Sequence, residues 1–180
     1  MGKVGIIANP AAGKDIRRLV AQGRFVTNRE KINVLGRILS GLKASGVDHI
    51  IMMPDSGMLG RIAVDTAGVN LRVDFLEMDV LNDETDSSRA ALGMVEAGVD
   101  CLVTLGGDGT NRAVVKGTCC VPIVPVSTGT NNVFPSMVEG TLAGLAAGVV
   151  ANGMVELSSV TAVSSILDIN IIITSINIFL

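Results

Sequence analysis

Short apolar runs alternate with longer amphipathic stretches along most of the chain. The apolar runs have the length of buried strands, and the stretches between them repeat apolar residues at steps of three and four, which is helix spacing. In one such stretch, Ile32, Leu35, Ile38, Leu39 and Leu42 fall on a single helix face. The pattern predicts strands over residues 4–8, 49–53, 71–77, 101–105 and 122–126, and helices over residues 30–43, 58–66, 86–96, 110–116 and 136–150.

This alternation predicts the α/β fold class. Strands that are apolar throughout and joined by helices belong to a parallel sheet with helices on both faces. Residues 1–155 are therefore expected to form a three-layer, Rossmann-like domain. Residues 156–180 are rich in Ile and Asn, and Asp168 within them argues against a membrane span. This tail is expected to begin a second, all-β domain that the chain does not complete.

The composition narrows the possible functions. A formal net charge of −3 and only four Phe, with no Trp or Tyr, argue against nucleic-acid binding, which needs a basic face or stacking aromatic residues. The apolar run at the N-terminus is too short for a signal peptide. An odd number of cysteines without zinc-site spacing indicates a reducing cytoplasm, and Cys101, Cys119 and Cys120 are each interpreted as small buried apolar residues.

Three polar loops that contain glycine follow predicted strands. They are NPAAGK after the first strand, GGDGTN after the fourth and STGTNN after the fifth. A fourth loop, PDSG after the second strand, is less informative. Ligands of open parallel sheets bind beyond the carboxyl ends of the strands, so these loops are expected on one edge of the sheet. Glycine, hydroxyl and amide groups at such an edge suit a phosphate-bearing ligand.

The loop after the fourth strand carries the chemistry. Gly106 and Gly107 permit a sharp turn and a close approach of a ligand to backbone N–H groups. Thr110 opens a helix whose N-terminus attracts anions. Asp108 lies beside them, where it can accept a proton from an attacking hydroxyl or help to hold Mg²⁺. Taken alone, an Asp-Gly pair is more often a turn or a helix cap.

The other two loops allow more than one interpretation. NPAAGK lacks the Gly and Ser/Thr positions of a Walker loop, but Asn9 and Lys14 can contact phosphate around a turn at Gly13, and a purely structural turn explains the loop equally well. STGTNN offers hydroxyls and amides to a ribose or adenine, or caps the next helix. Arg112 is close enough to the fourth-strand loop to contact phosphate. His49, with no partner in the sequence, is interpreted as structural.

The motif LGGDGT resembles the signature of the NAD kinase and diacylglycerol kinase superfamily, and NPAAGK is similar to its first-strand motif. With PIVPVSTGTNNVFP downstream, residues 1–155 most resemble the ATP-NAD kinase-like family, in its acetoin-catabolism protein X branch. The resemblance implies an N-terminal α/β domain, a C-terminal all-β domain and an active site between them. By the match, Asp108 is the catalytic residue and activates the acceptor hydroxyl. No residue is assigned as a metal ligand.

The nucleotide- and phosphate-binding residues expected from the loops and from the match are Asn9, Gly13, Lys14, Gly106, Gly107, Gly109, Thr110, Arg112, Thr128, Gly129, Thr130, Asn131 and Asn132.

The function predicted from the sequence is that of a kinase, an ATP-dependent phosphotransferase with an alcohol acceptor. The expected acceptor is the ribose 2′-OH of NAD, as in NADP biosynthesis. The resemblance implies ATP and NAD as substrates, Mg²⁺ as cofactor and a homo-oligomer. The composition and the cysteine pattern indicate a cytoplasmic protein without nucleic-acid or membrane partners. Two alternatives stay open: a lipid or small-alcohol kinase of the same superfamily, and a non-catalytic nucleotide-binding regulatory protein.

Overall fold

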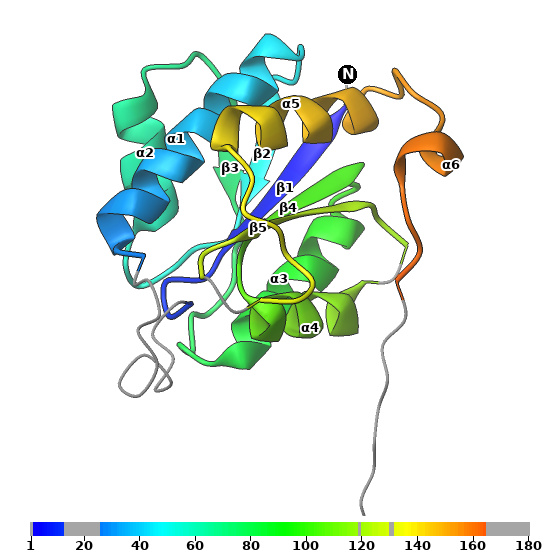
Figure 1. Ribbon diagram of the computed structural model, residues 1–180. Coiled ribbons are helices and arrows are strands. Elements are labelled where there is room, and N and C mark those ends of the chain that lie inside the picture. The colour runs from blue at the N-terminus through cyan, green and yellow to red at the C-terminus, as the bar shows by residue number, and fades with distance from the viewer. Residues whose placement is uncertain (1, 13–25, 119, 130–131, 165–180) are drawn as a thin grey trace, which may run out of the picture.

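The computed structural model describes residues 2–12, 26–118, 120–129 and 132–164. The strands are β1 (Lys3–Ala8), β2 (His49–Met52), β3 (Arg72–Phe75), β4 (Cys101–Gly106) and β5 (Ile123–Ser127). The helices are α1 (Asn28–Ala44), α2 (Leu59–Ala67), α3 (Glu84–Glu96), α4 (Asp108–Gly117), α5 (Gly140–Ala151) and α6 (Leu157–Val160). The strands form one sheet in the order β3-β2-β1-β4-β5, and every neighbouring pair is parallel (Figure 1). The predicted α/β class is confirmed.

The direction of strand addition reverses between β1 and β4. From β1 the chain moves outward to β2 and β3, and then returns to place β4 on the other side of β1, followed by β5. Loops that leave the carboxyl ends of two such strands turn toward opposite faces of the sheet, and ligands of open α/β folds bind between them. Residues 9–12 follow β1 and residues 107–110 follow β4, so the topology places both at this position.

Helices cover both faces of the sheet. Helices α1, α2 and α5 pack on one face, and α3 and α4 pack on the other (Figure 1). The side chains of β1 show the alternation that this requires, because Val4 and Ile6 belong to the first core and Ile7 to the second. All three are fully buried. The central strand is thus apolar on both faces, as the sequence pattern predicts.

The helix after β5 begins later than the sequence pattern predicts. It starts at Gly140 instead of residue 136. Ser136 forms a parallel bridge with Val126 of β5, so the chain is still extended there. Glu139 then caps the helix by accepting hydrogen bonds from the backbone N–H groups of Thr141 and Leu142. The other predicted elements lie within a few residues of their expected bounds.

The tail that follows α5 is described only in part. Residues 157–160 form the short helix α6, which the sequence analysis does not predict. The stretch expected to form strands, residues 170–180, lies outside the described residues. The two-domain organisation therefore stays a prediction.

The cysteines do not all share one environment. Cys101 is fully buried in β4, and burial raises the pKa of its thiol to about 12, so it remains a neutral apolar group at physiological pH. Cys120 is exposed, and its interpretation as a buried residue is wrong. It follows α4 in the connection to β5, where the chain lies at the surface. Cys119 lies outside the described residues.

His49 has a partner that the sequence analysis does not foresee. Its Nε2 lies 2.8 Å from Asp74 Oδ2, and Arg72 Nη2 lies 3.0 Å from the same oxygen. The hydrogen bond with His49 is the main factor that lowers the pKa of the Asp74 carboxyl. The three residues lie on neighbouring strands, where His49 pairs with Arg72 at the amino ends of β2 and β3. This cluster is at the edge of the sheet opposite to the polar loops, which agrees with a structural role.

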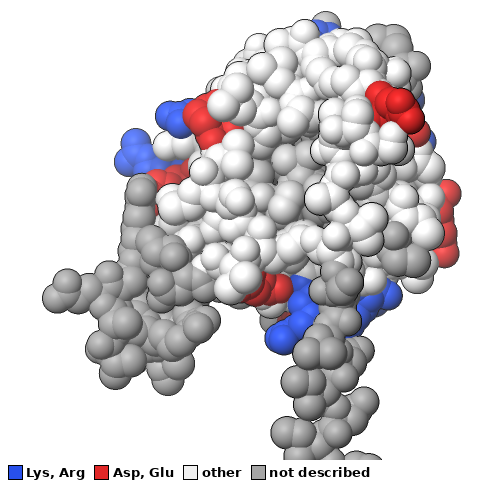
Figure 2. Space-filling model, turned by 45° about the vertical axis from the view of Figure 1, so that its right-hand side comes forward, with Lys and Arg blue, Asp and Glu red and all other residues white. Residues whose placement is uncertain are grey.

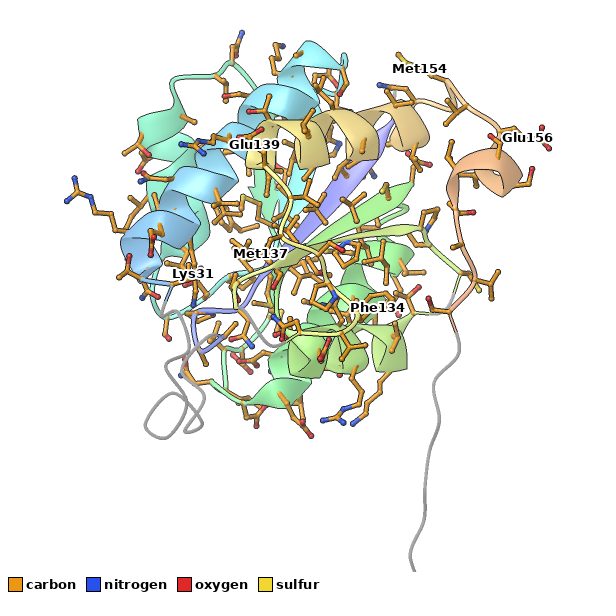
Figure 3. All side chains as sticks on the ribbon, in the orientation of Figure 1. Lys31, Phe134, Met137, Glu139, Met154 and Glu156 are labelled. Carbon is orange, nitrogen blue, oxygen red and sulfur yellow. The ribbon has the colours of Figure 1, made fainter. Side chains whose placement is uncertain are left out.

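Large apolar side chains are exposed along the C-terminal part of the described chain. We call this set the C-terminal apolar surface: Val133, Phe134, Met137, Val138, Leu142, Met154, Leu157, Val160 and Val163. Figure 2 turns the side that bears α6 forward, and most of the surface it shows is free of charged side chains. Residues 133–163 contain only two carboxylates, Glu139 and Glu156, and no Lys or Arg (Figure 3). Exposed apolar side chains with few charged residues between them are typical of interfaces.

Helices α1 and α5 approach each other backbone to backbone. A Cβ atom on Gly41 would collide with the Thr141 carbonyl oxygen, and one on Gly144 would collide with the Ile38 carbonyl oxygen. Neither obstacle is the flexible end of a side chain, so neither can move without moving a helix. These glycines are therefore required by close packing, although glycine in a helix interior costs about 0.5–1 kcal/mol relative to Ala.

We expect Gly144→Ala to destabilise the protein by at least about 1–3 kcal/mol, because the added methyl group overpacks the α1–α5 contact. The matched control is Gly36→Ala in α1, where the new Cβ would lie 3.9 Å from its nearest neighbour, Ala67 Cβ. That change should stabilise the protein by about 0.5–1 kcal/mol. Urea unfolding followed by circular dichroism measures both, and equal stability of the two variants would contradict the packing argument.

Candidate functional site

The turn that follows β1 is held within the protein. Asn9 Oδ1 accepts a hydrogen bond from Ala11 N at 2.8 Å, and Ala12 N donates to Asn9 O at 3.2 Å. Asn9 N donates to Leu105 O near the end of β4 at 3.1 Å. Pro10 has no N–H group. The backbone N–H groups of this turn thus donate to other protein groups. The turn therefore forms a wall of the site and offers few hydrogen-bond donors to an anion.

The Asn9 side chain joins the loops that follow β1 and β4. Its Nδ2 donates to Thr110 Oγ1 at 3.0 Å. Thr110 lies in the first turn of α4 and is only 6% exposed. The structure therefore brings together Asn9 and Thr110, two of the expected binding residues, and connects them across the two central strands.

The glycines after β4 have two different roles. A Cβ on Gly106 would overlap the Thr110 side chain, and a Cβ on Gly107 would lie 2.8 Å from Asn132 Oδ1. Gly106 thus leaves room for the Thr110 side chain, and Gly107 leaves room for the end of the Asn132 side chain. Their expected contacts with a ligand stay a prediction. At Gly109 a Cβ would meet nothing within 4 Å. The open space over the helix N-terminus is therefore at Gly109.

Asp108 is the first residue of α4, and its carboxylate binds the chain after β5. Its Oδ1 accepts hydrogen bonds from Val133 N at 3.1 Å and Phe134 N at 2.9 Å, and its Oδ2 accepts from Val133 N at 3.0 Å. The residue is half-buried. Each carboxylate oxygen has two lone pairs, so the group can still accept a proton or a further hydrogen bond. Asp108 thus lies at the predicted edge and also fixes a loop.

The loop after β5 folds against α4 through Asn132. Asn132 Oδ1 accepts from Asp108 N at 3.3 Å, and Asn132 Nδ2 donates to Ser127 Oγ at 2.8 Å. Ser127 Oγ also bonds to Gly129 O and accepts from Gly129 N. Asn132 and Gly129, both expected to bind a ligand, are therefore tied to protein groups by the hydroxyl of Ser127.

Three polar groups at this edge have no hydrogen-bond partner among the described residues. The backbone N–H groups of Gly109 and Thr110 belong to the first turn of α4, and no side chain caps the helix at Gly107. The third group is Thr128 Oγ1, in a residue that is 2% exposed. A buried hydroxyl without a partner is uncommon and is typical of a position completed by a ligand or ordered water.

The remaining expected residues are placed as follows. Arg112 is exposed on α4 and makes no ion pair with the described residues. Gly13, Lys14, Thr130 and Asn131 lie outside the described residues. Their expected roles stay predictions.

The PDSG loop after β2 reaches the same edge. Asp55 caps α2 by accepting from Leu59 N at 3.1 Å. A Cβ on Gly57 would lie 3.5 Å from Pro10 Cβ, which shows that this loop abuts the turn after β1. Its placement on the edge is as the sequence analysis expects.

Two buried polar features were not found from the sequence. Thr104 Oγ1 donates to Asn111 Oδ1 at 2.7 Å, and Asn111 Nδ2 donates to Gly107 O at 3.0 Å, which fastens α4 to β4. Lys31 is 1% exposed, although it is charged. A signal for Lys31 was present, because it lies four residues before Leu35 on the apolar face of α1.

Comparison with known proteins decides the family. The model described as the ATP-NAD kinase N-terminal domain matches residues 4–154. This chain belongs to that family. The chain is also 42% identical over 173 residues to the acetoin catabolism protein X of Cupriavidus necator, an alignment that covers 92% of this chain and 48% of that protein. It therefore spans about half the length of this curated relative. The resemblance seen in the sequence is confirmed.

The name of the family specifies a kinase that acts on ATP and NAD. No group of three or more His, Cys, Asp or Glu side chains within the described ranges is arranged to hold a metal ion. No helix within those ranges is both long and apolar enough to span a bilayer.

We expect Asn132→Ala to lower the free energy of unfolding by about 1–2 kcal/mol, because it removes the acceptor for Asp108 N and the amide that binds Ser127 Oγ. Hydrogen exchange should speed up at the amides of Val133 and Phe134. The control is Asn33→Ala at an exposed position of α1, which should change neither quantity appreciably. Unchanged exchange in the Asn132 variant would show that the loop does not depend on this side chain.

Proposed function

We propose that this domain acts in ATP-dependent phosphoryl transfer to an alcohol, with the ribose 2′-OH of NAD as the acceptor. The observation that carries the proposal is the position of Asp108 at the N-terminus of α4. There a carboxylate lies next to two backbone N–H groups without partners and next to open space at Gly109. The family shows the kinase-like class, and the acceptor is our inference.

The described residues fit a phosphate-bearing ligand. The N-termini of helices attract anions through their free N–H groups and dipole, and α4 begins with a glycine cap that leaves this end open. The Gly109 and Thr110 amides can bind phosphate oxygens, and the Thr128 hydroxyl is a further group that needs a partner. Lys14 and Arg112 are the cations that we expect to contribute from either side.

Asp108 is the proposed general base. It would accept the proton of the acceptor hydroxyl as that oxygen attacks the γ-phosphorus of ATP, while the bond from the γ-phosphorus to the bridging oxygen breaks and ADP leaves. A positioned base contributes about 10²–10⁴ in rate. The hydrogen bonds from Val133 N and Phe134 N hold the carboxylate in one orientation, which favours such positioning. Mg²⁺, when bound, would neutralise the phosphate charge, and Asp108 is the described carboxylate that can help to hold it.

A second candidate function is supported by the same contacts. Both carboxylate oxygens of Asp108 already accept backbone hydrogen bonds, as a purely structural anchor for residues 133–134 would. This arrangement favours a non-catalytic nucleotide-binding or regulatory domain as the alternative. The other alternative is a kinase of the same superfamily whose phosphoryl acceptor is a lipid or a small alcohol.

A panel of acceptors separates these functions. The chain is incubated with Mg²⁺ and γ-labelled ATP and with NAD, diacylglycerol or a small polyol, and nucleotide affinity is measured by calorimetry. Label on NAD supports the proposal, and label on another alcohol supports the corresponding kinase. Nucleotide binding without any labelled product supports the regulatory domain, and failure to bind ATP overturns all of these.

We also propose that the chain forms a homo-oligomer in the cytoplasm. The C-terminal apolar surface supports self-association, because several large apolar side chains are exposed there and exposed apolar side chains that gather often mark an interface. Sedimentation equilibrium over a range of concentrations is expected to give a mass above that of the 18.6 kDa chain. A single monomeric species at every concentration would reject this part of the proposal.

We expect Asp108→Asn to reduce turnover by at least about 100-fold, because the amide cannot accept the hydroxyl proton. The affinity for ATP should change by no more than about threefold, since Asn keeps the side-chain volume and one oxygen acceptor for the Val133 and Phe134 amides. Steady-state kinetics and calorimetry measure the two effects separately.

The matched control is Asp83→Asn, at an exposed carboxylate that caps α3. Asn caps helices about as well as Asp, so this variant should keep the stability and activity of the original chain. If Asp108→Asn retains full turnover, the base is another group and the proposed mechanism fails.

A further inference from the structure

Lys31 lies at a position that is unfavourable for a cation for two reasons, its burial and its place near the N-terminus of a helix. The residue is 1% exposed, and lysine is almost never fully buried without partners. It also lies in the first turns of α1, and its backbone N donates to Thr27 O. The N-terminal end of a helix repels positive charge. A methionine or leucine would fill this place on the apolar face of α1 at lower cost, so the ammonium group must make specific interactions.

The ammonium group of Lys31 binds the turn that follows β1. Its Nζ donates to Asn9 O at 3.2 Å, to Pro10 O at 2.9 Å and to Ala12 O at 2.7 Å. Figure 3 shows Lys31 at the start of α1, next to the chain that leaves β1. The carbonyls of this turn therefore converge on one buried cation from α1. A neutral apolar side chain of the same length cannot replace these bonds.

The same turn reaches the helix N-terminus of the candidate site. Asn9 Oδ1 is fixed by Ala11 N within the turn, and Asn9 Nδ2 binds Thr110 Oγ1. Thr110 carries one of the two α4 amides that have no partner among the described residues. A continuous series of hydrogen bonds thus runs from Lys31 through the turn to Asn9 and Thr110.

We propose that Lys31 is a positioning residue for the anion-binding end of α4, acting through the Asn9–Thr110 hydrogen bond. In this role it keeps the turn in the conformation that presents the Asn9 amide to Thr110. The inference rests on the proposed function in one respect, which is that the N-terminus of α4 binds the phosphates of ATP.

The test is a double-mutant cycle on MgATP affinity in the 180-residue chain. Lys31→Met keeps the unbranched side chain and removes the three donors, and Thr110→Val removes the acceptor of the Asn9 amide. We expect each variant to weaken MgATP binding by about tenfold, and the double variant to bind about as weakly as either one, because both break the same series of bonds. Effects that multiply to about a hundredfold would show independent roles and overturn the proposal.

The matched control is Lys43→Met, which removes an exposed lysine from the last turn of the same helix. It should bind MgATP like the original chain. Unaltered MgATP binding by a folded Lys31→Met variant, with Thr110→Val weakened, would also overturn the proposal. If the original chain itself does not bind MgATP, the proposed function fails first, so the two failures are distinguishable.

A measurement on the unmodified chain covers the case in which Lys31→Met does not fold. In uniformly ¹⁵N-labelled protein, the buried Lys31 ammonium should give a protected NMR signal, whereas exposed Lys43 exchanges rapidly with water. Addition of MgATP should shift the Lys31 signal together with the Thr110 amide signal. A shift at Thr110 with no change at Lys31 would show that the two are not coupled.

Discussion

The parallel pairing of β1 with β4 is the constraint on which the candidate site depends. The chain returns from β3 to place β4 beside β1, which brings residues 9–12 beside residues 107–110 although about a hundred residues separate them in the chain. The Asn9–Thr110 hydrogen bond closes this junction. The Thr104–Asn111 and Asn111–Gly107 bonds then fix the angle at which α4 leaves β4.

In the proposed mechanism, one carboxylate serves two purposes. Asp108 anchors the loop after β5, and it is the general base that we propose. These purposes are compatible, because hydrogen bonds that immobilise a carboxylate also reduce the reorganisation it needs to accept a proton.

The fold and the loops were predictable from the sequence because strand length, helix spacing and glycine placement are local properties. The strand order was not, since nothing in the local pattern says that β4 returns beside β1. Side-chain partners were predicted least well. Gly106 and Gly107 are expected to line the phosphates, and nothing in the local pattern shows that they also make room for Thr110 and Asn132. Lys31 was passed over because a lysine in a helix is usually solvated, and only the packing shows that this one is buried.

The glycine contact between α1 and α5 has a consequence for the walls of the site. The beginning of α1 carries Lys31, which grips the turn after β1, and the segment leading into α5 is the one held by Asp108. The turn after β1 and the segment before α5 are thus both attached to this pair of helices. Main-chain atoms in direct contact set the distance between α1 and α5, so residues that no nucleotide would touch help to determine the width of the site.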